Sequence, residues 1–171
     1  MIESVAAFQS YFESVRRRTL NFCAALPEER VDWAPQPGEF TCGDIVRHLA
    51  ASEQMFVTVA LTRRWYYPGH ERSLGADLRG ALAYLEASHM SAVAALGSLG
   101  DAALGHTCEG VGGHPIKIWR LLMLMAEHEV HHRSQLSSYL SLMGVEPPQL
   151  YGLHLEEVIS YGEGDPARAW G

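Results

Sequence analysis

Hydrophobic side chains recur at three- and four-residue intervals along most of the chain, which is the period of an amphipathic α-helix. Residues 2–26 show such a stripe, with charged side chains mostly off it. The members of the stripe are Phe8, Phe12, Val15, Thr19, Phe22 and Leu26. Pro27 ends the pattern, and the run 35–38, with its prolines and glycine, marks a connection. The sequence therefore predicts a first helix over residues 2–26 and a loop after it, with a short turn over 28–32.

A second helix is predicted to begin at Thr41. Thr41 and Asp44 have the spacing of a capping box, in which the hydroxyl and the carboxylate accept hydrogen bonds from backbone amides that the first turn leaves unpaired. The helical pattern continues to about Arg64, and the sequence Tyr-Tyr-Pro-Gly over residues 66–69 stops it.

A third helix is predicted to start after Ser73 and to end near Gly97 or Gly100. One of its faces carries a hydrophobic stripe that includes a histidine. The stripe consists of Leu78, Leu82, Leu85, His89 and Leu96. Residues 100–114 are rich in glycine, so a loop is expected there.

The fourth helix has the clearest boundaries in the sequence. Pro115 suits the first helical turn, because an amide proton would have no helical partner there. Gly144 favours a C-terminal stop, and Pro147 and Pro148 prevent continuation. The resulting helix has about 28 residues and a length of about 42 Å at 1.5 Å per residue. Residues 153–160 could form a further short helix.

Four long amphipathic helices, with no convincing alternating strand, predict an all-α fold: a four-helix bundle with long connections and a short C-terminal segment. Residues 1–160 are expected to form one domain, and residues 161–171 a flexible tail. The length of 171 residues is ample for one hydrophobic core, since a chain of about 150 residues buries about 70% of its unfolded surface.

The charge balance argues against a nucleic-acid-binding protein. The chain has 20 acidic and 13 basic side chains and a formal charge of −7, whereas phosphate binding relies on clustered lysine and arginine. The basic runs at residues 16–18 and 63–64 are interpreted as solvated helix faces. The three cysteines are widely spaced and form no CxxC pair, so neither a disulfide framework nor a cysteine-rich zinc site is indicated.

No segment of the sequence indicates export or membrane insertion. The N-terminus lacks the basic region followed by an apolar stretch that a signal peptide needs. The longest uninterrupted apolar run, residues 121–126, is far shorter than the ~20 residues that span a bilayer. A cytoplasmic protein with no membrane partner is therefore expected.

The unusual feature of the composition is the presence of nine histidines. His128 and His132 are four residues apart in the predicted fourth helix, so their imidazoles lie one turn apart on one face and can reach a single metal ion. At 100° per residue, Gln135 and Tyr139 share this apolar face within about 40° and could orient a ligand or substrate. A second interpretation stays open, in which one histidine packs in the core and the other lies at an edge.

A third histidine, on another helix, favours the metal interpretation. His48 lies in the second helix and shares a face with several inward-facing residues within about 40°. These are Thr41, Asp44, Ser52, Met55 and Val59. Burying several imidazoles without partners costs free energy, whereas one divalent cation can satisfy three nitrogens together. The sequence therefore indicates a metal site shared by two helices.

Three segments together resemble a known protein family. They are Trp33-x-Pro35, residues 44–49 (Asp-Ile-Val-Arg-His-Leu) followed by Glu53, and residues 128–136 (His-Glu-Val-His-His-Arg-Ser-Gln-Leu). On these segments the chain resembles the DinB/YfiT-like superfamily, over about residues 5–160. The resemblance implies a four-helix bundle, often a homodimer, that holds a divalent metal through three histidines. Carried over by motif, the ligands are His48, His128 and His132, whereas His131 matches no ligand position.

A metal bound by three protein nitrogens keeps a position for water or substrate, as catalytic zinc sites do. Zinc is expected because it is redox-silent and common in such sites, with nickel or iron as alternatives. The resemblance implies an enzyme for a small molecule. It would be either an S-transferase or isomerase that uses a low-molecular-weight thiol, or a hydrolase, with the metal activating a thiolate or water. The alternatives are a non-catalytic metal-binding stress-response or sensing module and a metal-free structural dimer.

Several residues near the predicted site have two interpretations. Glu53 is about 140° around the helix from His48; it could bond a ligand of the fourth helix, but a surface position is expected. Glu129 and Arg133 are predicted to form a solvent-facing pair on the fourth helix. His89 could face the site, although a buried or partly buried structural role is expected.

The remaining candidates have weaker patterns. Cys42, in the first turn of the second helix, is either a thiol activated by the helix dipole or a small buried hydrophobe, and the second is expected. Residues 65–67, Trp-Tyr-Tyr, are either a dimerisation patch or a cover for the bundle end. The loops 27–40 and 100–114 are expected to shape a pocket. The histidines expected at the surface are His70, His106, His114 and His154.

Overall fold

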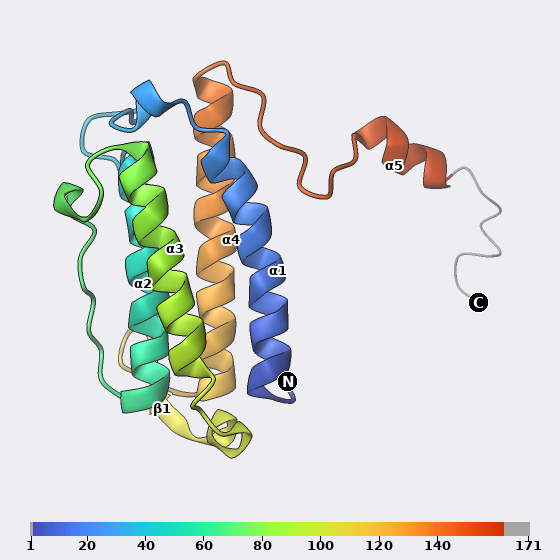
Figure 1. The fold of residues 1–171 in the computed structure, drawn as a ribbon. Coiled ribbons are helices and arrows are strands. Elements are labelled where there is room, and N and C mark those ends of the chain that lie inside the picture. Colours follow the sequence, from blue (N-terminus) through green and yellow to red (C-terminus); the bar gives the residue numbers. More distant parts are fainter. Residues whose placement is uncertain (1, 163–171) are drawn as a thin grey trace.

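The computed structural model describes residues 2–162, and four long helices contain most of them (Figure 1). These helices are α1 (Val5–Ala24), α2 (Cys42–Thr62), α3 (Leu78–Leu96) and α4 (Ile118–Leu142). The shorter elements are η1 (Glu28–Arg30), η2 (Arg72–Leu74), η3 (Asp101–Gly105), β1 (Thr107–Glu109), β2 (Pro115–Lys117) and α5 (Leu155–Gly162). The expected all-α four-helix bundle is confirmed.

The directions of the four helices do not simply alternate along the chain. α1 and α4 run one way along the bundle, and α2 and α3 run the other way (Figure 1). α2 packs against both α3 and α4, and α4 also packs against α1. Because the consecutive helices α2 and α3 are parallel, the connection over residues 63–77 has to return along the length of the bundle (Figure 1). We call residues 63–77 the returning connection.

The start of α2 is fixed by the expected capping box. Thr41 Oγ1 accepts a hydrogen bond from the amide of Asp44 at 3.1 Å, and Asp44 Oδ2 accepts one from the amide of Thr41 at 3.0 Å. The helix ends at Thr62, where Arg63 adopts a left-handed backbone with a φ of 63°. A well-fixed first turn also fixes the rotation of α2 and therefore the direction of His48, less than two turns further on.

The predicted loop over residues 100–114 and the predicted helix start at Pro115 are both wrong in part. β1 and β2 form an antiparallel hairpin in which Pro115 pairs with Glu109, and α4 begins only at Ile118. Gly112 and Gly113 form its turn with φ values of 83° and 81°, a conformation that glycine adopts without steric cost. Strands of three residues are too short to show alternation, and proline suits a strand start as well as a first helical turn.

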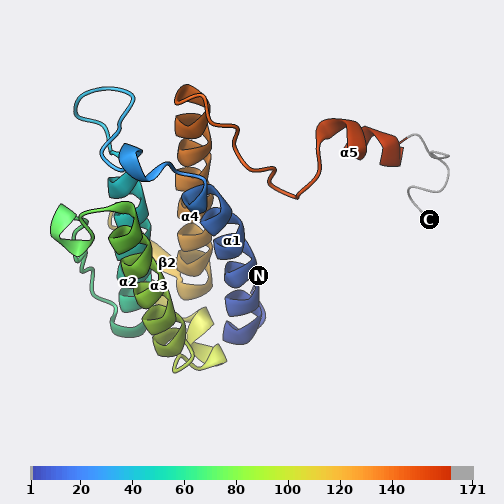
Figure 2. The ribbon, with the colours of Figure 1, turned by 45° about the horizontal axis from the view of Figure 1, so that its top comes forward.

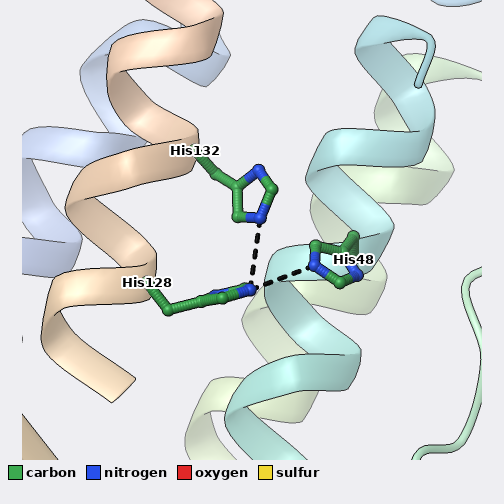
Figure 3. A group of neighbouring side chains, drawn as sticks. All are labelled: His48, His128 and His132. Carbon is green, nitrogen blue, oxygen red and sulfur yellow. Dashed lines mark hydrogen bonds between the residues drawn. The ribbon is translucent and has the colours of Figure 1, made fainter. Parts of the chain in front are cut away.

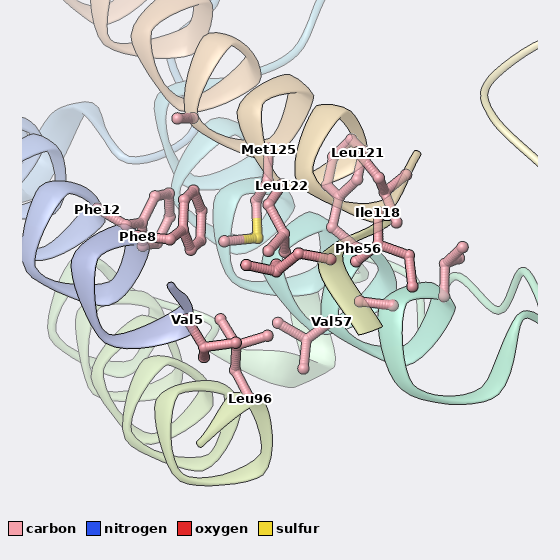
Figure 4. Close-up of a cluster of buried hydrophobic side chains, with 14 of the residues drawn as sticks. Val5, Phe8, Phe12, Phe56, Val57, Leu96, Ile118, Leu121, Leu122 and Met125 are labelled. Atoms are coloured by element: carbon pink, nitrogen blue, oxygen red, sulfur yellow. The ribbon is translucent and has the colours of Figure 1, made fainter. Parts of the chain in front are cut away.

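The hydrophobic side chains form two clusters, one toward each end of the bundle. The first includes Phe8, Phe56 and Leu121 (Figure 4). The second includes Leu49, from the N-terminal half of α2, and Leu136, from the C-terminal half of α4. Buried polar side chains occupy the layer between the two clusters. The members of this layer are Arg16, Thr19, Ser52, Glu53, Ser88, Glu129, His132 and Arg133, whereas buried Arg47 lies next to Val46 of the second cluster. The middle of the bundle is therefore polar, although it is deeply buried.

After α4 the chain continues in an extended segment to α5, which is set away from the four-helix body (Figures 1 and 2). α5 corresponds to the short helix expected over residues 153–160. The expected flexible tail, residues 161–171, lies outside the described residues apart from the last two positions of α5. None of the helices described here is long and apolar enough to cross a membrane.

Candidate metal centre

Three histidine side chains from two helices converge in the polar layer of the bundle (Figure 3). His48 comes from α2, and His128 and His132 come from successive turns of α4. Nε2 of His128 lies 3.1 Å from Nε2 of His48 and 3.2 Å from Nε2 of His132. The structure therefore brings together the three residues singled out by spacing and resemblance. We call them the histidine cluster.

The surroundings of the histidine cluster favour neutral imidazoles. His132 is buried, and His48 and His128 are partly buried. Burial and the neighbouring His132 and His128 lower the pKa of His48 to about 3. Burial, together with His132 and His131, lowers the pKa of His128 to about 4, and burial also lowers the pKa of His132. Neutral imidazole is the form that binds a metal ion, so the cluster is ready for ligation near pH 7.

The spacing and chemistry of the cluster fit a divalent transition metal. Two nitrogens that bind one ion at ~2.1 Å in tetrahedral directions lie about 3.4 Å apart, close to the two Nε2–Nε2 separations of 3.1 and 3.2 Å. Imidazole suits zinc, nickel, iron and copper. Ser52 Oγ lies 3.4 Å from Nε2 of His48 and adds a polar group to the same place. The residues present therefore fit the metal that the resemblance implies.

A chain of hydrogen bonds fixes the orientation of His132. The hydroxyl of Tyr139 donates to the backbone carbonyl of Phe40 at 3.0 Å, and its oxygen accepts from Nε2 of Gln135 at 3.1 Å. The carbonyl oxygen of Gln135 is thereby turned toward Nδ1 of His132, 2.9 Å away. Since that oxygen can only accept, Nδ1 of His132 carries the proton and Nε2 keeps its lone pair. Gln135 and Tyr139, expected to support the site, thus act on a histidine of the cluster.

The long connection over residues 63–77 adds two residues beside His48 that the sequence interpretation missed. The Tyr67 hydroxyl lies 2.7 Å from Nδ1 of His48 and 2.7 Å from Nδ1 of His70. The ring of Phe40 packs on both imidazoles, with centroids 5.1 Å from His48 and 4.7 Å from His70. His70 is partly exposed, so the expectation of a surface residue is wrong only in that His70 contacts Tyr67 and Phe40 beside the cluster. A loop has no helical period, so the sequence held no signal for this contact.

Comparison with known proteins identifies the family. A family profile, that of the DinB family, matches residues 1–164. The chain belongs to the DinB family. A search of the curated proteins found no match.

Solved structures show the same fold. A DinB-like protein from Bacillus cereus ATCC 10987 superposes with a TM-score of 0.70 at 18% identity, over 87% of this chain and 99% of that one. The DinB-like protein YjoA from Bacillus subtilis gives 0.66 at 21% identity, over 84% and 96%. YfiT from Bacillus subtilis gives 0.63 at 21% identity, over 82% and 90%, and is described as a probable metal-dependent hydrolase with an unusual four-helix bundle topology. At these identities the likeness concerns the fold.

A second polar group of this DinB chain, which we call the ion cluster, consists of Arg16, Glu53 and Glu129. Nη2 of Arg16 lies 2.7 Å from Oε2 of Glu53 and 3.1 Å from Oε2 of Glu129. None of the three residues is more than 2% exposed. Burial raises the pKa of Glu129, while the Arg16 charge opposes that rise. The ion cluster thus ties α1 to α2 and α4 at the level of the histidines.

The ion cluster overturns three expectations about charged residues. Glu53 is not at the surface, Glu129 and Arg133 are buried and do not form a solvent-facing pair, and Arg16 is not part of a solvated face. Arg16 and Glu53 are 37 residues apart in sequence. A polar residue beside a hydrophobic stripe looks the same in sequence whether it faces water or a buried partner. The partner can be identified only once the helices are placed side by side.

Other candidates behave as expected. His89 is partly buried and bonds Oε1 of Glu53 at 2.7 Å and Oε1 of Glu13 at 3.1 Å, which gives it a structural role. Cys42 is fully buried, and burial raises the pKa of its thiol to about 11, so it is a small hydrophobe rather than an activated thiol. The loop and tail histidines at exposed positions are His106, His114 and His154.

The aromatic run over residues 65–67 is divided among three environments. Trp65 packs against Phe56 and donates a hydrogen bond from Nε1 to the carbonyl of Glu109 at 3.2 Å, so it covers the bundle end beside β1. Tyr66 is 64% exposed. Tyr67 contacts His48. The run is therefore not one continuous patch.

Proposed function

We propose that this DinB chain is a metal-dependent enzyme for a small molecule, with a divalent metal held by His48, His128 and His132. The convergence of three Nε2 atoms within hydrogen-bonding distance carries the proposal. Zinc is the first choice, and nickel or iron would also suit nitrogen donors. A cytoplasmic homodimer, which the sequence and the resemblance imply, is part of the proposal.

The chain itself orients the histidine ligands and leaves them accessible to a small molecule. Gln135 holds His132 with its Nε2 lone pair toward the cluster. His48 and His128 are partly exposed, so a small molecule can approach from the solvent. Three protein ligands leave a coordination position for it. When bound, the metal would supply Lewis-acid polarisation to an oxygen or sulfur atom of that molecule.

Two reaction classes fit a polarised oxygen or sulfur. The description of YfiT, which shares the fold, supports a hydrolase. The family resemblance supports an S-transferase or isomerase that uses a low-molecular-weight thiol as co-substrate. Zinc accepts sulfur ligands as readily as nitrogen, so a thiol would suit the remaining coordination position.

The test begins with tag-free protein, its bound metal measured by mass spectrometry. Zinc-loaded protein is then screened by thermal shift against several low-molecular-weight thiols and assayed with ester and amide substrates. Two variants accompany it: His48→Ala, which removes a ligand, and His131→Ala, which removes an exposed histidine of the same region. We expect one zinc per chain in wild type and in His131→Ala, and little zinc in His48→Ala.

The outcomes separate the alternatives. Saturable stabilisation by one thiol, present in wild type and lost in His48→Ala, supports the transferase or isomerase. Zinc- and His48-dependent turnover of an ester or amide supports the hydrolase. If the protein binds one zinc tightly but gives neither result, the proposal of an enzyme would be overturned and a non-catalytic binding or sensing module would be supported. Wild-type protein that binds no divalent metal would overturn the whole proposal.

A further inference from the structure

One tyrosine hydroxyl lies between two imidazoles beside the histidine cluster. Tyr67 Oη is 2.7 Å from Nδ1 of His48 and 2.7 Å from Nδ1 of His70. Figure 3 shows one ring nitrogen of His48 facing His128 and the other on the far side of the ring. The nitrogen on the far side is the one that meets Tyr67.

The segment that carries Tyr67 and His70 is held firmly at this place. Arg47, the neighbour of His48 in α2, is 2% exposed. Its Nε donates to the carbonyl of His70 at 2.9 Å, and its Nη1 donates to the carbonyl of Gly75 at 2.6 Å. Its Nη2 pairs with Asp44 at 2.7 Å, inside the capping box of α2. The returning connection is therefore fastened to the same turns of α2 that orient His48.

The hydroxyl has a single proton, and when it donates that proton to one of the two imidazoles, two arrangements of the three side chains satisfy both contacts. In the first, Tyr67 donates to His70, and Nδ1–H of His48 donates to the Tyr67 oxygen, which leaves Nε2 of His48 as a lone pair. In the second, Tyr67 donates to Nδ1 of His48, and His70 donates to Tyr67. The second arrangement puts a proton on Nε2 of His48 and blocks that nitrogen as a ligand.

The rest of the cluster selects the first arrangement. Gln135 fixes Nε2 of His132 as a lone pair, and this atom lies 3.2 Å from Nε2 of His128. In metal-free protein Nε2 of His128 must therefore carry a proton, since two lone pairs at that distance would repel each other. Nε2 of His48 is 3.1 Å from the same Nε2–H of His128. If Nε2 of His48 also carried a proton, two N–H groups would face each other and repel. His48 therefore has to present its Nε2 lone pair to His128.

We propose that Tyr67 and His70 are positioning residues that fix His48 in the tautomer whose Nε2 lone pair faces His128. The Tyr67 oxygen accepts a hydrogen bond from Nδ1–H of His48, and Nδ1 of His70 accepts one from the Tyr67 hydroxyl. The effect on metal affinity rests on the proposed function, whereas the tautomer of His48 is a property of the metal-free protein. Hydrogen-bond partners of this kind typically change metal affinity by about 10- to 100-fold.

The first experiment is long-range 15N–1H NMR of the imidazoles in metal-free protein, with signals assigned by single-histidine variants. We expect His48 and His132 protonated on Nδ1, and His70 protonated on Nε2. In Tyr67→Phe, the signals of His48 should show a mixture of both tautomers. A wild-type His48 that carries its proton on Nε2 would overturn the proposal whether or not any variant folds.

The second experiment is a zinc titration in competition with a chelator. Tyr67→Phe should weaken zinc binding at least about 10-fold. The control, Tyr66→Phe, removes the hydroxyl of an adjacent exposed tyrosine and should leave the affinity unchanged. His70→Ala should also weaken binding, because Tyr67 then turns its proton toward His48. In the Tyr67→Phe background, His70→Ala should add nothing.

This double-mutant cycle separates positioning from a general loosening of the connection. The proposal would be overturned if the double variant lost the sum of the two single-variant losses in zinc affinity. It would also be overturned if Tyr67→Phe left the zinc affinity unchanged. A failure of the proposed function can be told apart from a failure of the tautomer assignment. Wild-type protein that binds no zinc, yet has His48 protonated on Nδ1, would remove the metal and leave the tautomer assignment in place.

Discussion

The histidine cluster and the ion cluster lie in the same buried layer, but their charges are satisfied in opposite ways. In the ion cluster Arg16 is a permanent cation that pairs with two carboxylates, Glu53 and Glu129. The histidine cluster consists of neutral imidazoles whose ring nitrogens converge on one another. The first cluster pairs its cation with carboxylates of the same chain, although Nε and Nη1 of Arg16 and Oε1 of Glu129 are buried without a hydrogen-bond partner within residues 2–162. The second is a set of neutral nitrogen donors of the kind that bind a divalent metal.

The two clusters are built from neighbouring positions of the same helices. Glu129 follows His128 directly in α4, and Glu53 lies five residues after His48 in α2. The helical rotation of 100° per residue turns these neighbours to different sides. A single polar layer can thus combine a structural ion pair that links α1, α2 and α4 with a ligand site between α2 and α4. Substitutions that break one cluster at a time test this division.

The largest effect is expected from removing the cation of the ion cluster. Arg16→Met leaves two buried carboxylates without a counter-charge, and breaking a buried pair in this way costs about 3–5 kcal/mol. The measurement is urea denaturation of the metal-free protein. Arg17→Ala, at an exposed position of the same helix, should change the free energy of unfolding by less than about 0.5 kcal/mol.

The triple variant Arg16→Met, Glu53→Leu, Glu129→Leu sharpens this prediction. Replacement of a buried cation together with its carboxylates by apolar side chains is often neutral or stabilising, because none of the three charges is left unpaired, and His89 keeps its contact with Glu13. We expect the triple variant to recover most of the stability that Arg16→Met loses. A loss below about 1 kcal/mol in Arg16→Met itself would show that the ion cluster is not a closed structural unit.

The next effect concerns the histidine cluster and depends on metal. At a free zinc concentration 1,000 times its Kd, wild-type protein should gain about 4 kcal/mol of stability. His132→Ala should lose most of this gain, but in metal-free protein it should be destabilised far less than Arg16→Met, since it leaves no buried charge. Paired denaturation curves with zinc and with a chelator measure both quantities, and His131→Ala is the matched control. An equal loss with and without zinc would mean that His132 is a structural core residue.

A smaller effect is expected at Gln135. Gln135→Leu removes the acceptor for Nδ1–H of His132 but keeps a side chain of similar size, so zinc affinity should fall about 10- to 100-fold. That range corresponds to about 1.4–2.7 kcal/mol. The titration uses Ser134→Ala, at an exposed neighbouring position, for comparison. Unchanged affinity in Gln135→Leu would show that the tautomer of His132 is set without this bond.

Much of this arrangement could be predicted from the sequence because it depends on helical period. The stripe of α4 places His128, His132 and Gln135 on one face, and the capping box at Thr41 fixes where α2 begins. The contacts of Arg16 with Glu53 and Glu129 could not be predicted, since a buried partner on another helix leaves no local pattern. The approach of Tyr67 to His48 depends on a returning connection with no period at all. The missed residues are therefore those whose position is set by packing between elements.

The smallest expected effect also distinguishes the two clusters, by the sign of a pKa shift. Burial lowers the pKa of His89, and the charge of Arg16 lowers it further. The hydrogen bond to Glu53, the charge of Glu53 and the hydrogen bond to Glu13 raise it. The net result is a pKa above 6.5. The histidine cluster has lowered pKa values. The ion cluster therefore attracts a proton to its neighbouring histidine, whereas the histidine cluster excludes one.

The direction of the pH dependence follows from this shift. A raised folded-state pKa means that folding strengthens proton binding, so the contribution of His89 to stability is full below pH 6.5 and is lost as the pH rises through the folded value. His89→Gln should differ most from wild type at pH 5.5 and least at pH 8.5, by less than about 1 kcal/mol because the pair is partly exposed. Urea denaturation of metal-free protein across this range measures the difference, with the exposed His114→Gln as control. A difference that stays constant with pH would mean that His89 is a neutral hydrogen-bond donor in the folded protein. The charged groups of this part of the bundle would then be Arg16 and its two carboxylates, without a protonated His89.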